Sequence, residues 1–247
     1  MSVSPVKSAI RVLEVLDYFQ RKRSPHQLKE ICAALGYPLS SGTVLLKNLA
    51  ALGYLNYDRT TRCYFPTLRV VALGDWISQA LLGQGQILDV MRELHGATGE
   101  TISIAVQNDV YLQYIRVIQS THALRFHTVE GSLRPLTLSA AGWLLMSAHA
   151  GKEVERLIRR ANIATARKED RQPAEQTMRR VNEARSVGAA YTEHIPLPGG
   201  ASVCVMLPVT MQERPVVLGL GGAVDRIRAN RDRYLRHMHD LADTLRA

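Results

Sequence analysis

The first 36 residues carry apolar positions spaced three and four apart, a pattern that predicts two short helices. In VKSAIRVLEVLDYF, residues 6–19, this spacing predicts a helix with one buried face. The polar stretch RKRSPH interrupts the pattern, and Ser24-Pro25 is expected to open a second helix over QLKEICAALG, which ends at Gly36. The expected buried face of the first helix is Val6, Ala9, Ile10, Leu13, Leu16 and Phe19.

A third helix is predicted from Ser40 to Leu52, after the short turn Tyr37-Pro38-Leu39. Ser40 or Ser41 can cap its first turn, and Gly53 ends it. Two short helices joined by three or four residues, the second of which opens with exposed serine and threonine, have the proportions of a helix-turn-helix. The expected apolar face of the third helix is Val44, Leu45, Leu49 and Leu52.

The next segment, LNYDRTTRCYFPT, has two short aromatic-rich runs on either side of the polar turn DRTTR, which predicts a β-hairpin. A hairpin directly after such a helix makes a winged helix, and its tip carries two long cations suited to phosphate or minor-groove contact. Such modules also serve as protein docking domains, so the pattern favours DNA binding without excluding docking. The expected DNA-binding residues are Ser40, Ser41, Thr43, Lys47, Arg59 and Arg62.

From residue 68 to residue 87 the chain has helical spacing and little charge, which predicts either a rigid connector or a dimerisation helix. Beyond it, TISIAVQ and VYLQYIRVI form a predicted hairpin, GSLRPL is extended and leads into a helix of small residues, and polar helices are expected near residues 152–162 and 174–186. The strands AAYTEH, ASVCVMLPV and PVVLGLGG follow, before a last helix at residues 228–245. The prediction is an α+β protein of two domains, with six strands in the second.

The distribution of charge supports an anionic partner. The chain has a formal net charge of +9. Residues 1–75 hold ten basic and five acidic side chains, a surplus of +5 on less than a third of the chain. Although many basic proteins do not bind nucleic acid, a surplus concentrated on the predicted winged helix is what DNA binding requires.

The rest of the chain offers little support for other chemistry. No apolar stretch approaches the roughly 20 residues of a membrane span, and the start lacks a signal-peptide pattern, so a cytoplasmic protein without membrane contact is expected. Cys32, Cys63 and Cys204 show no metal-ligand spacing, and His237 and His239 point apart on a predicted helix. The run GLGGAV lacks the full dinucleotide fingerprint. We therefore predict no metal, no cofactor and no enzymatic activity.

Five blocks of the chain stand in a specific order and spacing: VKSAIRVLEVLDYF, SSGTVLLKNLAALGYLNYDRTTRCYFPTLRVVALG, TGETISIAV, GSLRPLTLSAAGWLLMSA and ASVCVMLPVTMQERPVVLGLGG. In this arrangement the chain resembles the IclR family of bacterial transcriptional regulators over nearly its whole length. The resemblance implies a winged helix-turn-helix that binds double-stranded operator DNA (residues 1–67), a linker helix (68–87) and an effector-binding domain (88–247). It also implies a homodimer or dimer of dimers that represses or activates genes, frequently for the catabolism of aromatic or other organic acids.

Matched residue by residue, the resemblance puts the recognition helix on residues 40–49. Many members of the family have arginine where this chain has Val44, which places more weight on Lys47 and the hairpin. In the helix after Pro135, the histidine and lysine common in the family are replaced by Thr137 and Trp143.

The effector pocket implied by the resemblance is lined by the sheet and by the helix after Pro135. Where members that bind polar carboxylates place acidic or hydroxyl groups on the last strands, this chain has Leu220 and Gly222, so we hypothesise a less polar effector. The matching pocket positions are Ser103, Ala105, Ala141, Gly142, His194, Cys204, Leu220 and Gly222.

The sequence thus predicts a DNA-binding transcriptional regulator whose small organic effector, with aromatic and carboxylic acids as candidates, changes its affinity for operator DNA, and the helix of residues 68–87 is the predicted transmitter. The alternative is a metabolite-binding protein or enzyme that uses the winged helix for assembly. That alternative requires turnover or ligand binding independent of DNA, and an N-terminal domain that can be removed without loss of activity.

Overall fold

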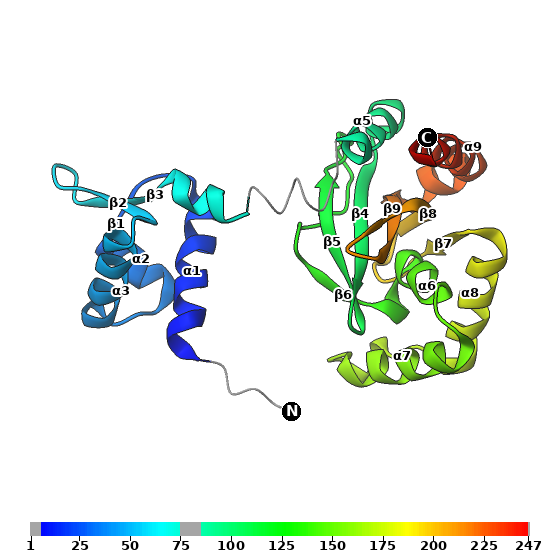
Figure 1. Ribbon diagram of the computed structural model, residues 1–247, viewed down its shortest axis with the longest axis horizontal. Helices are drawn as coiled ribbons and strands as arrows, with labels where there is room; N and C mark the ends of the chain where they lie inside the picture. Colours follow the sequence, from blue (N-terminus) through cyan, green and yellow to red (C-terminus); the bar gives the residue numbers. More distant parts are fainter. Residues whose placement is uncertain (1–5, 75–84, 247) are drawn as a thin grey trace. The chain divides into compact units, whose positions relative to one another are not determined.

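The chain divides into an N-terminal unit of residues 1–80 and a C-terminal unit of residues 81–247 (Figure 1). One cluster of buried hydrophobic side chains lies in the first unit and two lie in the second. The computed structural model describes residues 6–74 and 85–246. Residues 68–74 are helical, whereas residues 75–84 of the predicted linker helix lie outside the described residues. The predicted domain boundaries at residues 67 and 87 therefore stay a prediction.

The N-terminal unit is a winged helix, as predicted. The hairpin gains a third strand that the sequence pattern does not predict, because His26 pairs with Tyr64 and Gln27 with Cys63 in an antiparallel sheet of order β1-β3-β2. This pairing joins the segment before the second helix to the wing. The elements are α1 (Lys7–Lys22), β1 (His26–Gln27), α2 (Leu28–Leu35), α3 (Leu39–Ala51), β2 (Leu55–Asp58) and β3 (Cys63–Pro66).

Local hydrogen bonds set where the helices begin. The side chain of Gln27 accepts from the backbone N–H of Glu30, and the Glu30 carboxylate accepts from the Gln27 N–H at 2.7 Å, a capping box that starts α2. The bond from Gln27 also lowers the pKa of Glu30. Helix α3 begins at Leu39 with Pro38 at its N-cap, so the prediction that Ser40 or Ser41 caps it was wrong. Both serines instead lie within the first turn.

The buried face of α1 also differs from the predicted one. Val15, Tyr18 and Phe19 are buried, so Phe19 is the one fully buried member of the predicted face. The helix carries two apolar stripes at helical spacing, and periodicity cannot tell which of them packs against the domain. The other stripe, here called the α1 stripe, comprises Val6, Ile10 and Leu13, whose side chains are 66%, 39% and 62% exposed.

An antiparallel sheet of six strands, in the order β6-β5-β4-β9-β8-β7, forms the C-terminal unit and confirms the predicted sheet. Strands β4 (Thr101–Asn108) and β9 (Arg214–Ala223) are far apart in the sequence but adjacent in the sheet, where Ser103 pairs with Gly219. The remaining elements are α5 (Gln86–Thr98), β5 (Tyr111–Ile118), β6 (Leu133–Pro135), α6 (Ala140–Ser147), α7 (Gly151–Ala164), α8 (Ala174–Val187), β7 (Ala189–Glu193), β8 (Gly200–Met211) and α9 (Val224–Asp243).

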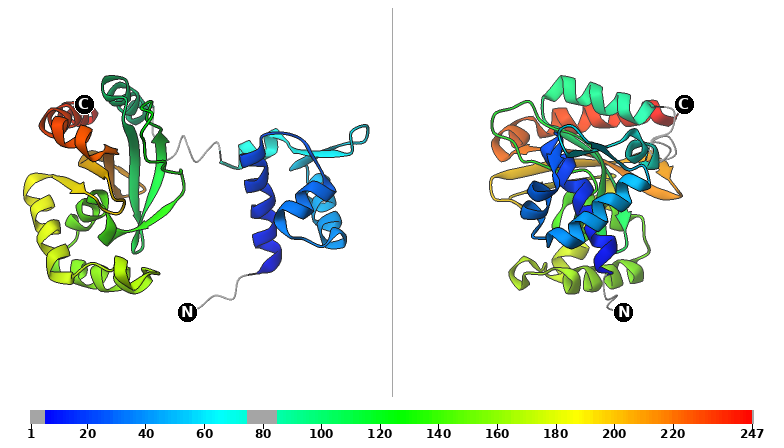
Figure 2. Two further views of the ribbon diagram at one scale, coloured as in Figure 1. Left: turned by 180° about the vertical axis from the view of Figure 1, so that it is seen from behind. Right: turned by 90° about the vertical axis from the view of Figure 1, so that its left-hand side faces the viewer.

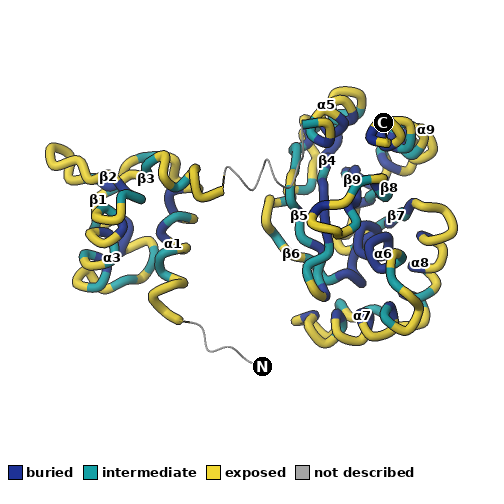
Figure 3. Tube along the Cα trace, viewed as in Figure 1, coloured by how far each residue is buried: buried dark blue, intermediate teal, exposed yellow. Residues whose placement is uncertain are grey.

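The two faces of this sheet are covered by different helices. Helices α5 and α9 lie side by side on one face (Figure 2), where they enclose Ile102, Ile104 and Leu218. Helix α6, packed with α7 and α8, covers the other face and is buried for nearly its whole length (Figure 3). Because side chains alternate along a strand, Ser103 and Ala105 of β4 face α6.

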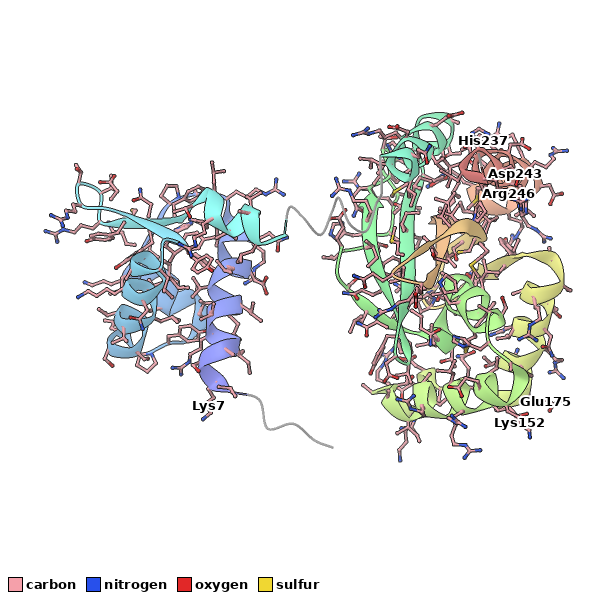
Figure 4. All side chains as sticks on the ribbon, viewed as in Figure 1. Lys7, Lys152, Glu175, His237, Asp243 and Arg246 are labelled. Atoms are coloured by element: carbon pink, nitrogen blue, oxygen red, sulfur yellow. The ribbon has the colours of Figure 1, made fainter. Side chains whose placement is uncertain are left out.

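Apart from the buried Glu100, the charged side chains of the described residues are at least partly exposed. Lys7 projects from the start of α1, Lys152 from the start of α7, and Arg246 lies at the end of the C-terminal unit (Figure 4). Among the helices in the described ranges, none combines the length and apolar character needed to cross a membrane.

Candidate nucleic-acid interface and ligand cavity

The solvent-facing side of α3 is opposite its buried side. Gly42, Leu46 and Leu49 are buried in the domain. At 3.6 residues per turn, Ser40, Val44, Lys47 and Ala51 lie on the far side of the helix, and all four are exposed. This set is called the α3 outer face.

Two residues predicted to face the core of the domain do not. Val44 and Leu52 are 60% and 58% exposed, so this part of the prediction was wrong. Leu46, which was not in the predicted face, is 1% exposed. The burial of Gly42 turns the helix so that Leu46 points inward and Val44 points to solvent.

Helices α2 and α3 approach each other closely at Gly42. A Cβ atom at this position would lie 2.2 Å from the sulfur of Cys32, so the packing requires glycine. Burial raises the pKa of the Cys32 thiol, which therefore stays protonated at neutral pH. This contact fixes the position of α3, the second helix of the helix-turn-helix, against α2.

Two of the predicted DNA-binding hydroxyls already have partners within the helix. The Ser41 hydroxyl donates to the carbonyl of Pro38 at 3.1 Å, and the Thr43 hydroxyl donates to the carbonyl of Leu39 at 2.7 Å. These bonds engage the hydroxyl hydrogens and leave the oxygens free to accept. Ser40 and Lys47 are exposed on the α3 outer face.

The wing presents its arginines at the tip of a tight turn. Asp58 accepts from the N–H of Thr60 and the hydroxyl of Thr61, both at 2.8 Å, and these bonds lower the pKa of Asp58. Arg59 and Arg62 are exposed, and neither forms an ion pair with any residue that the structure describes. Both guanidinium groups are thus exposed at the tip of the wing, and their contact with phosphates stays a prediction.

A cavity of about 90 Å³ lies in the C-terminal unit between the sheet and the start of α6. Its walls combine hydroxyl groups, glycine backbone, aromatic and aliphatic side chains and one arginine. The sheet contributes Thr101, Ser103, Tyr114, Arg134, Gly200, Ala201, Ser202, Cys204, Gly219, Leu220, Gly221 and Gly222. The start of α6 contributes Ser139 and Ala141, and the connections contribute Phe126, Thr128, Ile195, Pro196 and Leu197.

Five of the eight pocket positions proposed from the sequence line this cavity, namely Ser103, Ala141, Cys204, Leu220 and Gly222. Leu220 does so through its backbone, because its side chain is on the α5–α9 face of the sheet.

The other three positions lie outside the cavity wall. Ala105 packs in the hydrophobic cluster under α6. Gly142 lies against the Leu136 carbonyl, where a Cβ atom would come within 2.0 Å of the oxygen. His194 is exposed, and its Nδ1 accepts from the N–H of Gly199 at 3.0 Å, so it holds the segment of residues 195–197 in place instead of facing a ligand.

Arg134 is the charged group of the cavity, and it is not among the pocket positions predicted from the sequence. The guanidinium of this half-buried residue lies 5.6 Å from the ring centre of Tyr114. In the described part of the chain no carboxylate pairs with it. In the sequence, Arg134 is recognisable only as part of the extended stretch before Pro135. The face of the sheet on which its side chain lies depends on the pairing of β6 with β5, and the sequence does not reveal this pairing. An unpaired cation beside hydroxyl groups suits a small anion.

The Cys204 thiol also faces the cavity. Burial raises its pKa to about 12, so it remains an un-ionised thiol at neutral pH and is a poor nucleophile. Gly219 lies next to it, and a Cβ atom there would sit 2.9 Å from the Ser103 hydroxyl oxygen. Glycine at this position therefore keeps the floor of the cavity open.

Glu193 ends β7 just before the cavity wall of residues 195–197. Its carboxylate accepts from Arg228 Nε at 2.9 Å and Arg228 Nη2 at 2.6 Å, and from the Tyr191 hydroxyl. These hydrogen bonds, the one from Arg228 foremost, lower the pKa of Glu193 to about 2. The ion pair thus connects the end of the wall to α9.

The substitution Glu193→Gln is expected to lower the melting temperature at pH 7 and to have little effect near pH 2. Because the folded-state pKa lies below the ordinary value of 4.5, the stabilisation is complete above pH 4.5 and is lost as the pH falls toward 2. Circular dichroism melts from pH 7 to pH 2 measure the difference between wild type and variant. Glu155→Gln is the control, since Glu155 is exposed and forms no ion pair within the described chain. A difference of constant size down to pH 2 contradicts the assignment.

Family comparisons agree with this division into two units. Residues 8–59 match the model of the IclR helix-turn-helix domain, and residues 85–247 match the model of the bacterial transcriptional regulator IclR C-terminal domain. The chain is 25% identical over 217 residues to the HTH-type transcriptional regulator KdgR of Escherichia coli K12, covering 85% of this chain and 81% of KdgR. It is 27% identical over 152 residues to the transcriptional repressor AllR of the same strain, covering 60% of this chain and 55% of AllR.

Solved structures show the same architecture. The effector domain of the transcriptional regulator IclR from Acinetobacter sp. ADP1 is 46% identical, with a TM-score of 0.64 over 68% of this chain and 98% of that domain. IclR of Thermotoga maritima, at 14% identity, has a TM-score of 0.75 and covers 96% of this chain and 98% of its own.

Proposed function

Because the chain belongs to the IclR family of bacterial transcriptional regulators, we propose that α3 and the wing bind operator DNA and that a small organic acid in the cavity controls this binding. The chain is a DNA-binding transcriptional regulator of the IclR type. A regulator that binds operator DNA acts in the cytoplasm, where the bacterial chromosome is located.

The proposed DNA contacts come from the α3 outer face and the tip of the wing. Lys47 and Ser40 offer donors on the exposed side of α3, while Ser41 and Thr43 keep acceptor oxygens at its start. The wing adds two unpaired guanidinium groups. Phosphate contacts hold the protein on the duplex, and contacts from α3 to base edges select the sequence.

Alanine at Arg59 or Arg62 is expected to weaken binding to operator and random duplexes alike, and to reduce the slope of log K against log salt by about 1 for each phosphate that the variant no longer binds. Alanine at Ser41 or Thr43 is expected to change the ratio of the two affinities instead. Fluorescence anisotropy at several salt concentrations measures both quantities. Equal losses of affinity on operator and random DNA for all four variants contradict this division of roles.

We propose a homodimer that forms through the α1 stripe. Three apolar side chains of this stripe lie on one side of the helix and are exposed within the unit, where a second copy would cover them. A dimer with two recognition helices fits two half-sites about one helical turn, roughly 34 Å, apart. Leu13→Glu is the direct test, because a buried charge on both copies would raise the dissociation constant of the dimer in sedimentation equilibrium, whereas Asp17→Asn should not.

The unpaired guanidinium of Arg134 is the observation that carries the choice of effector. It supports a ligand with a carboxylate that accepts hydrogen bonds from Arg134 and from the hydroxyls of Ser103 or Thr128. Phe126 and Leu197 would contact the apolar remainder of the ligand. The less polar effector expected from Leu220 and Gly222 is thus revised to an acid with an apolar part.

An anisotropy titration tests the whole proposal. The full chain is mixed with its own upstream intergenic DNA and with a scrambled duplex, at two salt concentrations. Preferential, salt-sensitive binding to the native fragment supports the regulator, and addition of monocarboxylic and aromatic acids should then shift its affinity. By linkage, an acid that weakens DNA binding tenfold is itself bound ten times more weakly by the complex with DNA. Equal, weak binding to both duplexes contradicts the proposal.

A further inference from the structure

Val44 is the apolar centre of the α3 outer face. It is 60% exposed, with Ser40 one turn before it and Lys47 one turn after it. Its side chain adds nothing to the core of the winged helix, because Gly42, Leu46 and Leu49 form the buried side. A partner that covers the α3 outer face therefore contacts the Val44 side chain.

The hydrogen bonds of α3 leave few polar donors around Val44. The hydroxyl hydrogen of Thr43 is engaged by the Leu39 carbonyl and that of Ser41 by the Pro38 carbonyl. The middle of the α3 outer face thus presents methyl groups, and the donors along it, the Ser40 hydroxyl and the Lys47 amine, lie one turn away on either side.

In the major groove of DNA the apolar group offered by a base pair is the C5-methyl of thymine, whereas the other base edges present hydrogen-bond donors and acceptors. A valine side chain that covers such a donor or acceptor leaves it without a partner. We propose that Val44 contacts a thymine methyl, and so selects thymine at one position of each operator half-site. This inference rests on the proposed binding of DNA by α3.

The expected effect is small but specific. Removing one buried methyl group from the contact is expected to weaken binding about fourfold, equivalent to about 0.8 kcal/mol. The loss of affinity on removal of the thymine methyl should depend on Val44, because a methyl group forms no hydrogen bond with which another residue could recognise it.

The test uses the full chain to select duplexes from a randomised library. In the selected duplex, each thymine is replaced in turn by deoxyuridine, which lacks only the C5-methyl. Anisotropy then gives Kd for the wild type, for Val44→Ala and for a control, Leu39→Ala. Leu39 lies on the same helix and is 50% exposed, but it is not on the α3 outer face. Leu39→Ala therefore also removes an exposed apolar side chain, at a position outside the proposed contact. Thermal melts check that the variants fold.

The inference predicts one thymine per half-site at which deoxyuridine weakens the wild type and Leu39→Ala about fourfold but leaves Val44→Ala unchanged. It is overturned if every deoxyuridine penalty is the same in Val44→Ala as in the wild type, even though the selected duplex is bound specifically. If the library yields no preferred sequence at all, the proposed DNA-binding function fails, and this inference fails with it.

Discussion

Replacing Arg226 with methionine is expected to lower the free energy of unfolding of the C-terminal unit by about 3–5 kcal/mol. The Glu100 carboxylate is fully buried, and it accepts from Arg226 Nε at 2.7 Å and from Arg226 Nη2 at 3.0 Å. Without this partner a carboxylate is left in the interior, beside Gly222, with His122 Nε2 as a weaker neighbour at 3.7 Å. For a domain of this size the loss corresponds to a fall in melting temperature of roughly 6–20 °C.

Arg228→Met is the matched control for this prediction. Arg228 lies on the same helix and also makes two hydrogen bonds to a glutamate, but its side chain is 54% exposed and Glu193 remains partly accessible. Its replacement should have a much smaller effect, because water screens an exposed ion pair. Removing both buried charges, with Arg226→Met and Glu100→Leu together, should recover much of the stability. Similar, small losses for the two single variants in urea denaturation contradict the argument.

Arg134→Gln is expected to weaken binding of an organic acid effector about 30-fold or more, while DNA binding in the absence of effector is unchanged. Removing one partner of a desolvated, hydrogen-bonded charge pair typically costs 2–5 kcal/mol, because the other charge is left buried without a partner. Isothermal titration calorimetry with the acid that shifts operator affinity most measures the loss. The variant should then bind operator DNA equally well with and without that acid.

Arg125→Gln supplies the control for the effector site. Arg125 belongs to the connection of residues 119–132, which also carries Phe126 and Thr128, but it is exposed and does not line the cavity. If the net positive charge alone mattered, both variants would lose the same affinity for the acid. A carboxylate bound at Arg134 predicts that only Arg134→Gln loses affinity. Undiminished affinity in Arg134→Gln places the acid group elsewhere in the cavity.

Local patterns predicted most of the fold, and the family resemblance predicted five of the nineteen residues that line the cavity. The helices and the wing hairpin follow from apolar periodicity and from turn residues, which act over a few neighbours in the chain. Ser103, Ala141 and Cys204 were found through the resemblance to the IclR family, whose pocket positions fall on strands and a helix that are recognisable in the sequence. Phe126 and Thr128 were missed because they come from a long connection without periodicity, which hydrogen bonds such as that from Arg226 to the Leu124 carbonyl hold in place.

The sequence by itself determined the order of elements, the winged helix, the six strands and the concentration of positive charge near the N-terminus. Only the tertiary structure decided which stripe of α1 is buried, that Val44 faces outward, and that Arg134 meets Ser103 and Phe126 around one cavity. The physical reason is the range of the interactions involved. Helix propensity and turn geometry act between near neighbours, whereas the buried face of a helix and the walls of a cavity depend on packing between segments far apart in the chain.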